Sequence, residues 1–106
     1  MKTIGTTLYL KGGDTKLMIV ARGNIIEENK EQIIYDYGAC IYPMGLDIEN
    51  LYYFNEEDID KVVFEGYKDE GEERFMEMYN NWIEENKDKY KKVKVSDAMN
   101  NKDTNN

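Results

Sequence analysis

The sequence predicts an α+β domain: a small, curled antiparallel sheet of about five strands with a long C-terminal amphipathic helix packed on one face. Two observations predict this class. Five short runs rich in β-branched and aromatic residues are separated by turn-forming residues, which is typical of strands. One later run carries apolar residues at helical spacing. The 106 residues fit one domain. We expect this domain at 1–92, followed by a flexible polar tail at 93–106.

The N-terminal part predicts a β-hairpin. Residues 6–11 form its first strand, Gly12, Gly13 and Asp14 form a turn, and residues 16–22 form its second strand. We expect the Gly-Asn pair after residue 22 to end this strand. The next stretch, IIEENKEQ at 25–32, fits either a polar loop or one helical turn.

A third strand is predicted at residues 33–43. Side chains alternate along a strand, so one face carries Tyr35, Tyr37, Ala39 and Ile41, and the other carries Ile34, Asp36, Gly38, Cys40 and Tyr42. Gly38 indicates a bulge or a close backbone approach. Pro43 and Gly45 then end the strand.

The middle of the chain predicts two more strands around a short helical turn. Residues 50–54 are a candidate fourth strand, and Asn55 is a suitable cap for a helical turn at 56–60, with Asp58 at its third position. Residues 61–66 are the fifth strand, which ends at its glycine.

The C-terminal helix is predicted at roughly 70–91, with Asp69 as a plausible cap. Its apolar stripe consists of Phe75, Met78, Tyr79, Trp82, Ile83 and Tyr90. Acidic residues in its first turn and lysines in its last turn match the helix dipole. We expect contact between the sheet and Phe75, Met78, Tyr79, Trp82 and Ile83 to supply the core.

Charge and composition exclude several classes of function. The net charge is −8, and residues 47–77 hold twelve acidic and three basic side chains, a net charge of −9. Such a surface disfavours binding to nucleic acid and to anionic lipid. There is no histidine, which removes the commonest general base and metal ligand. The single cysteine, Cys40, allows no internal disulfide and is interpreted as structural. No apolar run approaches transmembrane length, so we expect a cytoplasmic protein.

The stretch FNEEDIDKVVFEGYKDEGEERF at 54–75 holds nine carboxylates and is the strongest candidate for a chemical site. A calcium-binding loop is excluded, because Asp58 and Asp60 are followed by Lys61 and two valines. Residue type alone leaves a glycosidase-like carboxylate pair open. The local interpretation is favoured: these acids surround a capped turn and begin a helix. We therefore predict no catalytic, metal-binding or cofactor-binding residues, and expect a solvated surface or, second, a partner-binding surface.

Three stretches in order, GTTLYLKGGDTKLMIVARG, YDYGACIYPMG and YYFNEEDIDKVVFEGYKDEGEERF, resemble a small uncharacterised family, a domain of unknown function, from Gram-positive bacteria. Its members are often encoded beside LXG toxins in type VII secretion loci. The resemblance covers residues 4 to about 78. It implies a cytosolic accessory protein for toxin export, acting as adaptor, chaperone or targeting factor, and not an enzyme. It carries no established functional residues.

Our first hypothesis is a non-enzymatic protein that binds the helical targeting region of an LXG toxin or another product of its locus. The candidate partner-binding residues are Tyr52, Tyr53, Glu65, Tyr67 and Glu73, since exposed tyrosines beside an acidic rim are typical of protein interfaces. The alternative is an immunity protein that neutralises a cognate toxin domain. An enzyme would require a deep pocket with at least two converging polar side chains.

Overall fold

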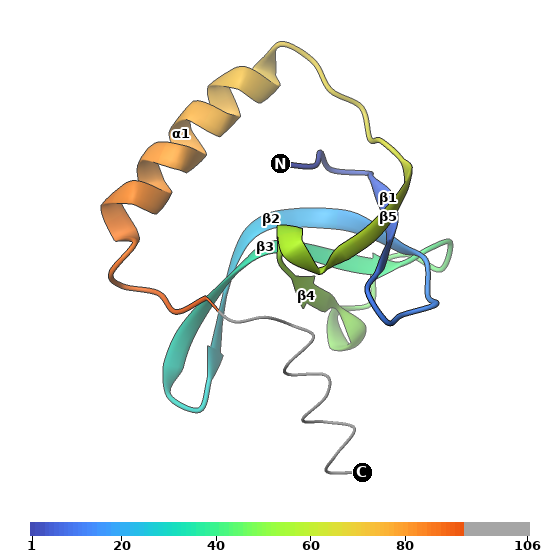
Figure 1. Ribbon diagram of the computed structural model, residues 1–106, viewed down its shortest axis with the longest axis horizontal. Coiled ribbons are helices and arrows are strands. Elements are labelled where there is room, and N and C mark those ends of the chain that lie inside the picture. Colours follow the sequence, from blue (N-terminus) through green and yellow to red (C-terminus); the bar gives the residue numbers. More distant parts are fainter. Residues whose placement is uncertain (93–106) are drawn as a thin grey trace.

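A computed structural model describes residues 1–92, so the predicted tail at 93–106 lies outside the described residues. Residues 1–92 form a five-stranded antiparallel sheet in the order β4-β3-β2-β1-β5, followed by one α-helix (Figure 1). The elements are β1 (Thr7–Leu10), β2 (Leu17–Glu28), β3 (Glu31–Ile41), the 3-10 helix η1 (Ile48–Asn50), β4 (Tyr52–Phe54), the 3-10 helix η2 (Glu56–Asp58), β5 (Ile59–Phe64) and α1 (Gly71–Asn86). The predicted α+β class is confirmed.

β2 and β3 form one long hairpin, which corrects two predictions. The Gly-Asn pair does not end the second strand: Gly23 takes a left-handed backbone conformation (φ +70°), yet pairing with β3 resumes at the next residue and β2 continues to Glu28. Residues 25–32 are neither a loop nor a helical turn. They are the end of this hairpin, and Asn29 and Lys30 both have positive φ values (51° and 67°), as in a two-residue hairpin turn.

The short link between β4 and β5 requires the sheet to curl. These strands stand at opposite ends of the strand order, so in a flat sheet they would lie about 19 Å apart, four spacings of about 4.8 Å. The chain from Phe54 to Ile59 reaches about 18 Å even when fully extended. Three of its four linking residues form η2, which shortens it further. The observed link therefore fits only a curled sheet.

The core lies within the curled sheet and draws on all five strands. It consists of Leu8, Leu10, Leu17, Ile19, Tyr37, Ala39 and Phe54, with Ile41 and Ile59 packed against it. The prediction that α1 supplies the core is wrong, since this cluster contains no residue of α1 and α1 itself has no buried residue. The reason is the curl, which buries one sheet face against itself. Cys40 is buried, as predicted.

The N-terminal segment packs where β5 ends. A Cβ on Gly66 would lie only 2.2 Å from the backbone oxygen of Ile4, so this position has no room for a side chain. The Gly66 N–H donates to Thr6 Oγ1 at 3.0 Å, and Thr3 Oγ1 donates to the Gly66 carbonyl at 2.9 Å. β5 thus ends at Phe64, two residues before the predicted end, and the chain then passes over the N-terminal segment towards α1.

α1 lies outside the curled sheet and does not enter the core that the sheet encloses (Figure 1). It is shorter than predicted, ending at Asn86 instead of near residue 91. Asp69 Oδ1 accepts a hydrogen bond from the Gly71 N–H at 2.9 Å, so this carboxylate does serve the start of the helix. No helix within residues 1–92 is long and apolar enough to cross a membrane.

Candidate functional site

The five predicted partner-binding residues come from three places in the fold. Tyr52 and Tyr53 are neighbours on the edge strand β4, where Tyr52 is exposed and the half-buried Tyr53 packs its ring on a tyrosine of β3. Glu65 and Tyr67 follow β5, the opposite end of the strand order, and Tyr67 is 82% exposed. Glu73 is exposed in the first turn of α1. The set therefore spans both edge strands of the sheet and the start of α1.

The acidic stretch is divided among separate structural roles. Asn55 and Asp58 form a capping box on η2, in which the Asn55 N–H donates to Asp58 Oδ2 at 2.8 Å. Asn55 Oδ1 in turn accepts from the Asp36 N–H at 2.9 Å, and Asp36 Oδ2 accepts from the Glu56 N–H at 2.9 Å. Asn55 and Asp58 are both buried. This confirms the predicted capped turn and shows that it is attached to β3.

Glu56 joins the N-terminus to the core. Tyr37 donates its hydroxyl proton to Glu56 Oε2 at 2.6 Å and accepts from the Lys2 N–H at 2.6 Å, while Lys2 Nζ donates to Glu56 Oε1 at 2.9 Å. Burial, together with the hydrogen bond to Glu56, raises the pKa of the Tyr37 phenol. Burial alone raises the pKa of Glu56, but hydrogen bonds from Tyr37 and Lys2 outweigh it and lower that pKa. At neutral pH the phenol stays protonated and the carboxyl stays ionised, which suits a structural link.

A paired arginine and glutamate attach α1 to β2. Arg22 donates from Nη1 to Glu72 Oε2 at 2.8 Å and from Nη2 to Oε1 at 3.0 Å. The two side chains are only 9% and 11% exposed, and the guanidinium lies 4.0 Å from the ring centroid of Phe75. The hydrogen bonds from Arg22 hold the pKa of the Glu72 carboxyl below its usual value. The first turn of α1 is thus fixed to the sheet.

The geometry of the acidic stretch offers no metal centre. Within residues 1–92, no group of three or more histidine, cysteine, aspartate or glutamate side chains is placed to hold a metal ion. Glu56 and Glu72 each have a cationic partner, and Asp58 and Asp69 each accept a backbone N–H. These carboxylates stabilise local structure and do not converge on one point.

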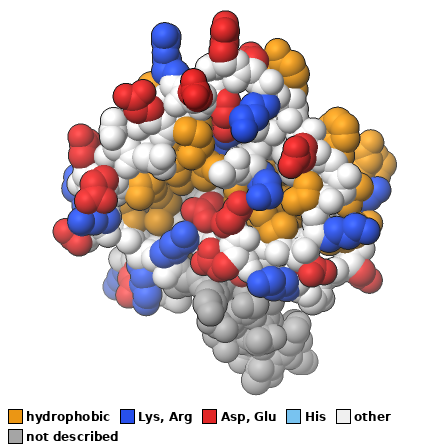
Figure 2. All heavy atoms as spheres, turned by 45° about the horizontal axis from the view of Figure 1, so that its top comes forward, with side chains coloured by type: hydrophobic (Ala, Val, Ile, Leu, Met, Phe, Trp, Pro, Cys, Tyr) orange, Lys and Arg blue, Asp and Glu red, His pale blue; other side chains and the backbone are white. Residues whose placement is uncertain are grey.

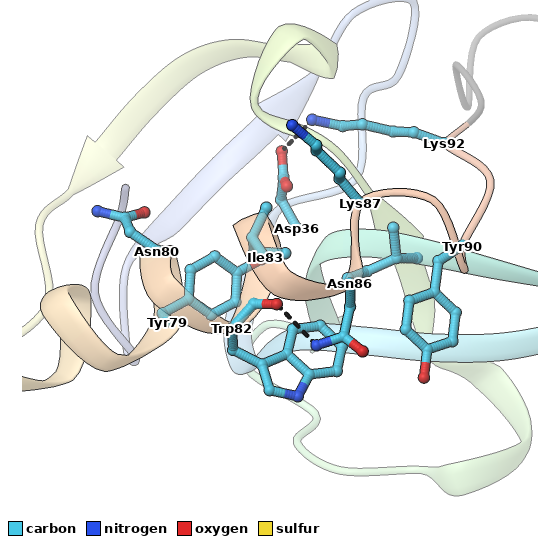
Figure 3. Close-up of a pocket in the computed structure, with 10 residues that line it drawn as sticks. Asp36, Tyr79, Asn80, Trp82, Ile83, Asn86, Lys87, Tyr90 and Lys92 are labelled. Atoms are coloured by element: carbon cyan, nitrogen blue, oxygen red, sulfur yellow. Dashed lines mark hydrogen bonds and ion pairs between the residues drawn. The ribbon is translucent and has the colours of Figure 1, made fainter.

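A cavity of about 250 Å³ lies between α1 and β3 (Figure 3). Its lining includes Ile34 of β3, Tyr79 and Ile83 of α1, and the rings of Trp82 and Tyr90, which stack at 5.5 Å between centroids. Burial, with a contribution from a nearby aspartate, raises the pKa of the Tyr79 phenol to about 12. That hydroxyl is buried and has no hydrogen-bond partner among the described residues. We name this hollow the α1–β3 pocket; its lining suits an apolar or aromatic group.

Two polar interactions are formed by residues that line the α1–β3 pocket. The Asp36 carboxylate forms an ion pair with Lys92 Nζ at 3.4 Å, and Asn86 Nδ2 donates to the Trp82 carbonyl at 2.8 Å (Figure 3). The side chains of Asp36, Asn86 and Lys92 are therefore engaged with the protein itself.

A second surface, missed by sequence reasoning, lies between β3 and β4. Met44, Leu46 and Ile48 are among the most exposed large apolar side chains of the described chain. We name residues 42–52 the β3–β4 segment. Its sequence signal is an alternation of apolar residues with Pro43, Gly45 and Asp47, which was interpreted only as the end of a strand. Apolar side chains also reach the surface in several places among charged ones on the face shown in Figure 2.

Comparison with known proteins gives one match. A family model described as "Domain of unknown function (DUF4176)" matches residues 1–75, which include the whole sheet, the β3–β4 segment and the first residues of α1. No curated protein and no solved structure matches the chain. The helical residues of the α1–β3 pocket lie beyond the matched part, since the first of them is Tyr79.

Proposed function

This chain belongs to the family defined by the domain of unknown function DUF4176, and on that premise we propose that it is a non-enzymatic accessory protein. Its role is to bind a protein partner encoded by an LXG toxin locus of a type VII secretion system. In that role it acts in the cytoplasm as an adaptor, chaperone or targeting factor. The partner is the helical targeting region of the toxin or another product of the locus.

The observation that carries this proposal is the exposure of Met44, Leu46 and Ile48 on the β3–β4 segment. Single exposed apolar residues are ordinary on protein surfaces, whereas groups of large ones mark interaction sites. Here three occur within five consecutive residues. Such an arrangement supports a binding function more than it supports chemistry.

The charge distribution supports a basic partner. Residues 47–77 have a net charge of −9, given by twelve acidic and three basic side chains. A strongly negative field speeds the encounter with a positively charged surface and disfavours acidic competitors. The same field suits the alternative, an immunity protein that binds a basic toxin domain. The three sequence stretches, taken in order, carry the family resemblance, and that resemblance implies the accessory role. We therefore place the accessory role first.

Co-purification with the two halves of a neighbouring LXG toxin tests the proposal. The full chain is co-expressed with the tagged N-terminal targeting half or with the tagged C-terminal toxic half, and complexes are separated by size exclusion at physiological salt. An unrelated acidic protein of similar size controls for association by charge alone. Elution with the N-terminal half supports the accessory role, and elution with the C-terminal half supports the immunity role. Failure to elute with either half, or with other products of the locus, contradicts both.

A further inference from the structure

We propose that the β3–β4 segment is a docking surface for an amphipathic helix with a basic polar face, contributed by a different protein. This inference rests on the proposed function, because it names the surface and the partner chemistry of that binding activity. Three observations carry it: the exposure of the segment, the way its backbone is held, and the charge around it.

The exposure is large and concentrated. Met44 is 83% exposed, Leu46 is 67% exposed and Ile48 is 79% exposed. Tyr42 and Tyr52, at the two ends of the segment, are exposed as well. Burial of such side chains against a partner is favourable in proportion to the apolar area removed from water. The segment therefore places three exposed apolar side chains within five residues of the chain.

Hydrogen bonds hold the backbone of this segment in place. The Tyr42 N–H donates to the Lys16 carbonyl at 2.9 Å, and the Gly45 N–H donates to the Ile41 carbonyl at 2.9 Å. Asp47 then caps η1, accepting from the Glu49 N–H at 3.1 Å and from an asparagine side chain at 2.7 Å. These bonds order the loop while its apolar side chains remain in water. A surface ordered before binding loses less conformational entropy on binding.

The charge around the segment selects a basic protein partner. Residues 42–60 contain six acidic side chains and no basic one. Of the six, Asp58 is buried and Glu56 pairs with Lys2, which leaves Asp47, Glu49, Glu57 and Asp60 as the exposed carboxylates that set the field. One cation from outside the segment, Lys16, lies over the Tyr42 ring at 5.6 Å. A second copy of this chain, with a net charge of −8, is repelled by this field, and so is an anionic lipid surface. A helix with lysine or arginine on its polar face is attracted, and its apolar face can cover the exposed anchors.

The adjacent strand explains why the partner is a helix and not an added strand. β4 is an edge strand of only three residues, Tyr52–Phe54. A strand added there gains very few backbone hydrogen bonds, and backbone hydrogen bonds supply the affinity in that mode of recognition. A helix satisfies its own backbone groups and needs only apolar contact and charge.

Chemical-shift mapping with a synthetic peptide tests the inference independently of the toxin. The probe is a peptide of about 18 residues, five helical turns, with leucines at i, i+3, i+4 and i+7 spacing and lysines elsewhere. It is titrated into the isotope-labelled full chain. We expect shifts centred on residues 42–52. A peptide with glutamate in place of lysine, and a scrambled peptide of unchanged composition, should both bind at least about tenfold more weakly.

A matched pair of variants locates the surface. The triple variant Met44→Ser, Leu46→Ser, Ile48→Ser should weaken binding of the lysine peptide at least about tenfold. The control triple variant Val63→Ser, Phe64→Ser, Tyr67→Ser changes side chains that are also exposed, at the opposite end of the strand order. This control should stay within about twofold of the original chain. Circular dichroism verifies that both variants fold.

Four results would overturn the inference: shifts centred on the α1–β3 pocket, equal binding of the glutamate peptide, self-association lost in the first triple variant, or stronger binding to anionic vesicles than to the lysine peptide. The toxin experiment separates the two proposals. If the original chain binds neither toxin half and no other product of the locus, the proposed function fails, whereas the peptide mapping still decides the docking surface. If the first triple variant binds the toxin as well as the original chain does, the docking surface is wrong and the function stands.

Discussion

Replacement of Gly23 by alanine tests whether α1 packs on β2 at this residue. Gly23 has φ +70°, and a Cβ built there lies 2.6 Å from Cε2 of Tyr79. An alanine at residue 23 should therefore destabilise the fold in two ways. Its backbone conformation is unfavourable, and its Cβ collides with the Tyr79 ring on α1. Gly12 is the matched control, since it has φ +76° but nothing within 4 Å of an added Cβ.

The two costs have different magnitudes. The left-handed conformation costs an alanine about 1–2 kcal/mol, and this loss of stability is expected at both glycines. Displacing the Tyr79 ring adds about 1–3 kcal/mol, as overpacking usually does, and is expected only at Gly23. Gly23→Ala should therefore destabilise the chain by about 1–3 kcal/mol more than Gly12→Ala. In a chain that also carries Tyr79→Ala, this difference between the two glycine variants should disappear.

Urea unfolding measures both losses, followed by circular dichroism and by the fluorescence of Trp82. Trp82 is the single tryptophan of the chain and lies on α1, so its emission reports the helix directly. The reasoning is refuted if Gly23→Ala and Gly12→Ala cost the same. It is also refuted if the extra cost of Gly23→Ala persists when Tyr79 is removed.

Three further predictions concern the buried polar links. Tyr37→Phe removes the hydroxyl bonded to Glu56; we expect a loss of about 1–3 kcal/mol in urea unfolding and a rise in the carboxyl pKa by NMR titration. Glu72 has a depressed pKa, so its stabilisation is complete above the unfolded pKa of about 4.3 and falls as the pH drops through the lower folded pKa. Glu72→Gln should flatten the pH dependence of stability in this acidic range, and an unchanged profile would contradict the assignment. Asn55→Ala leaves the Asp36 N–H without its acceptor, and should cost about 1–3 kcal/mol in urea unfolding, whereas a loss near zero would show that water replaces the side chain.

The local features of the fold were predictable, and the long-range features were not. The capped turn at Asn55 and Asp58 follows from residue types at fixed spacing, and the structure contains it. The continuation of β2 through Gly23 does not follow from local sequence, because a Gly-Asn pair usually ends a strand. The Tyr79 ring also packs on this glycine from a distant part of the chain. A sequence pattern carries no direct sign of such a contact.

The same limit applies to the candidate surface. The alternation of Met44, Leu46 and Ile48 is visible in the sequence, but alternation does not say which way the side chains face. In β3 the alternating residues Tyr37 and Ala39 point into the core, as the pattern predicts. In the β3–β4 segment a similar pattern is exposed, since no other element within residues 1–92 covers it. Only the arrangement of the strands distinguishes the two cases.

The curl of the sheet explains the structural role of the acidic stretch. The residues between β4 and β5 must join two ends of the strand order within a short reach, so η2 is capped by Asp58 and attached to β3 through Asn55. Fixing β4 in this way also fixes the C-terminal end of the β3–β4 segment, which runs directly into that strand. Asp58 is buried in this role, so the negative field of the region comes from exposed carboxylates such as Asp47, Glu49, Glu57 and Asp60. Closing the curl and, in the proposed docking, attracting a basic partner therefore fall to different carboxylates of one stretch.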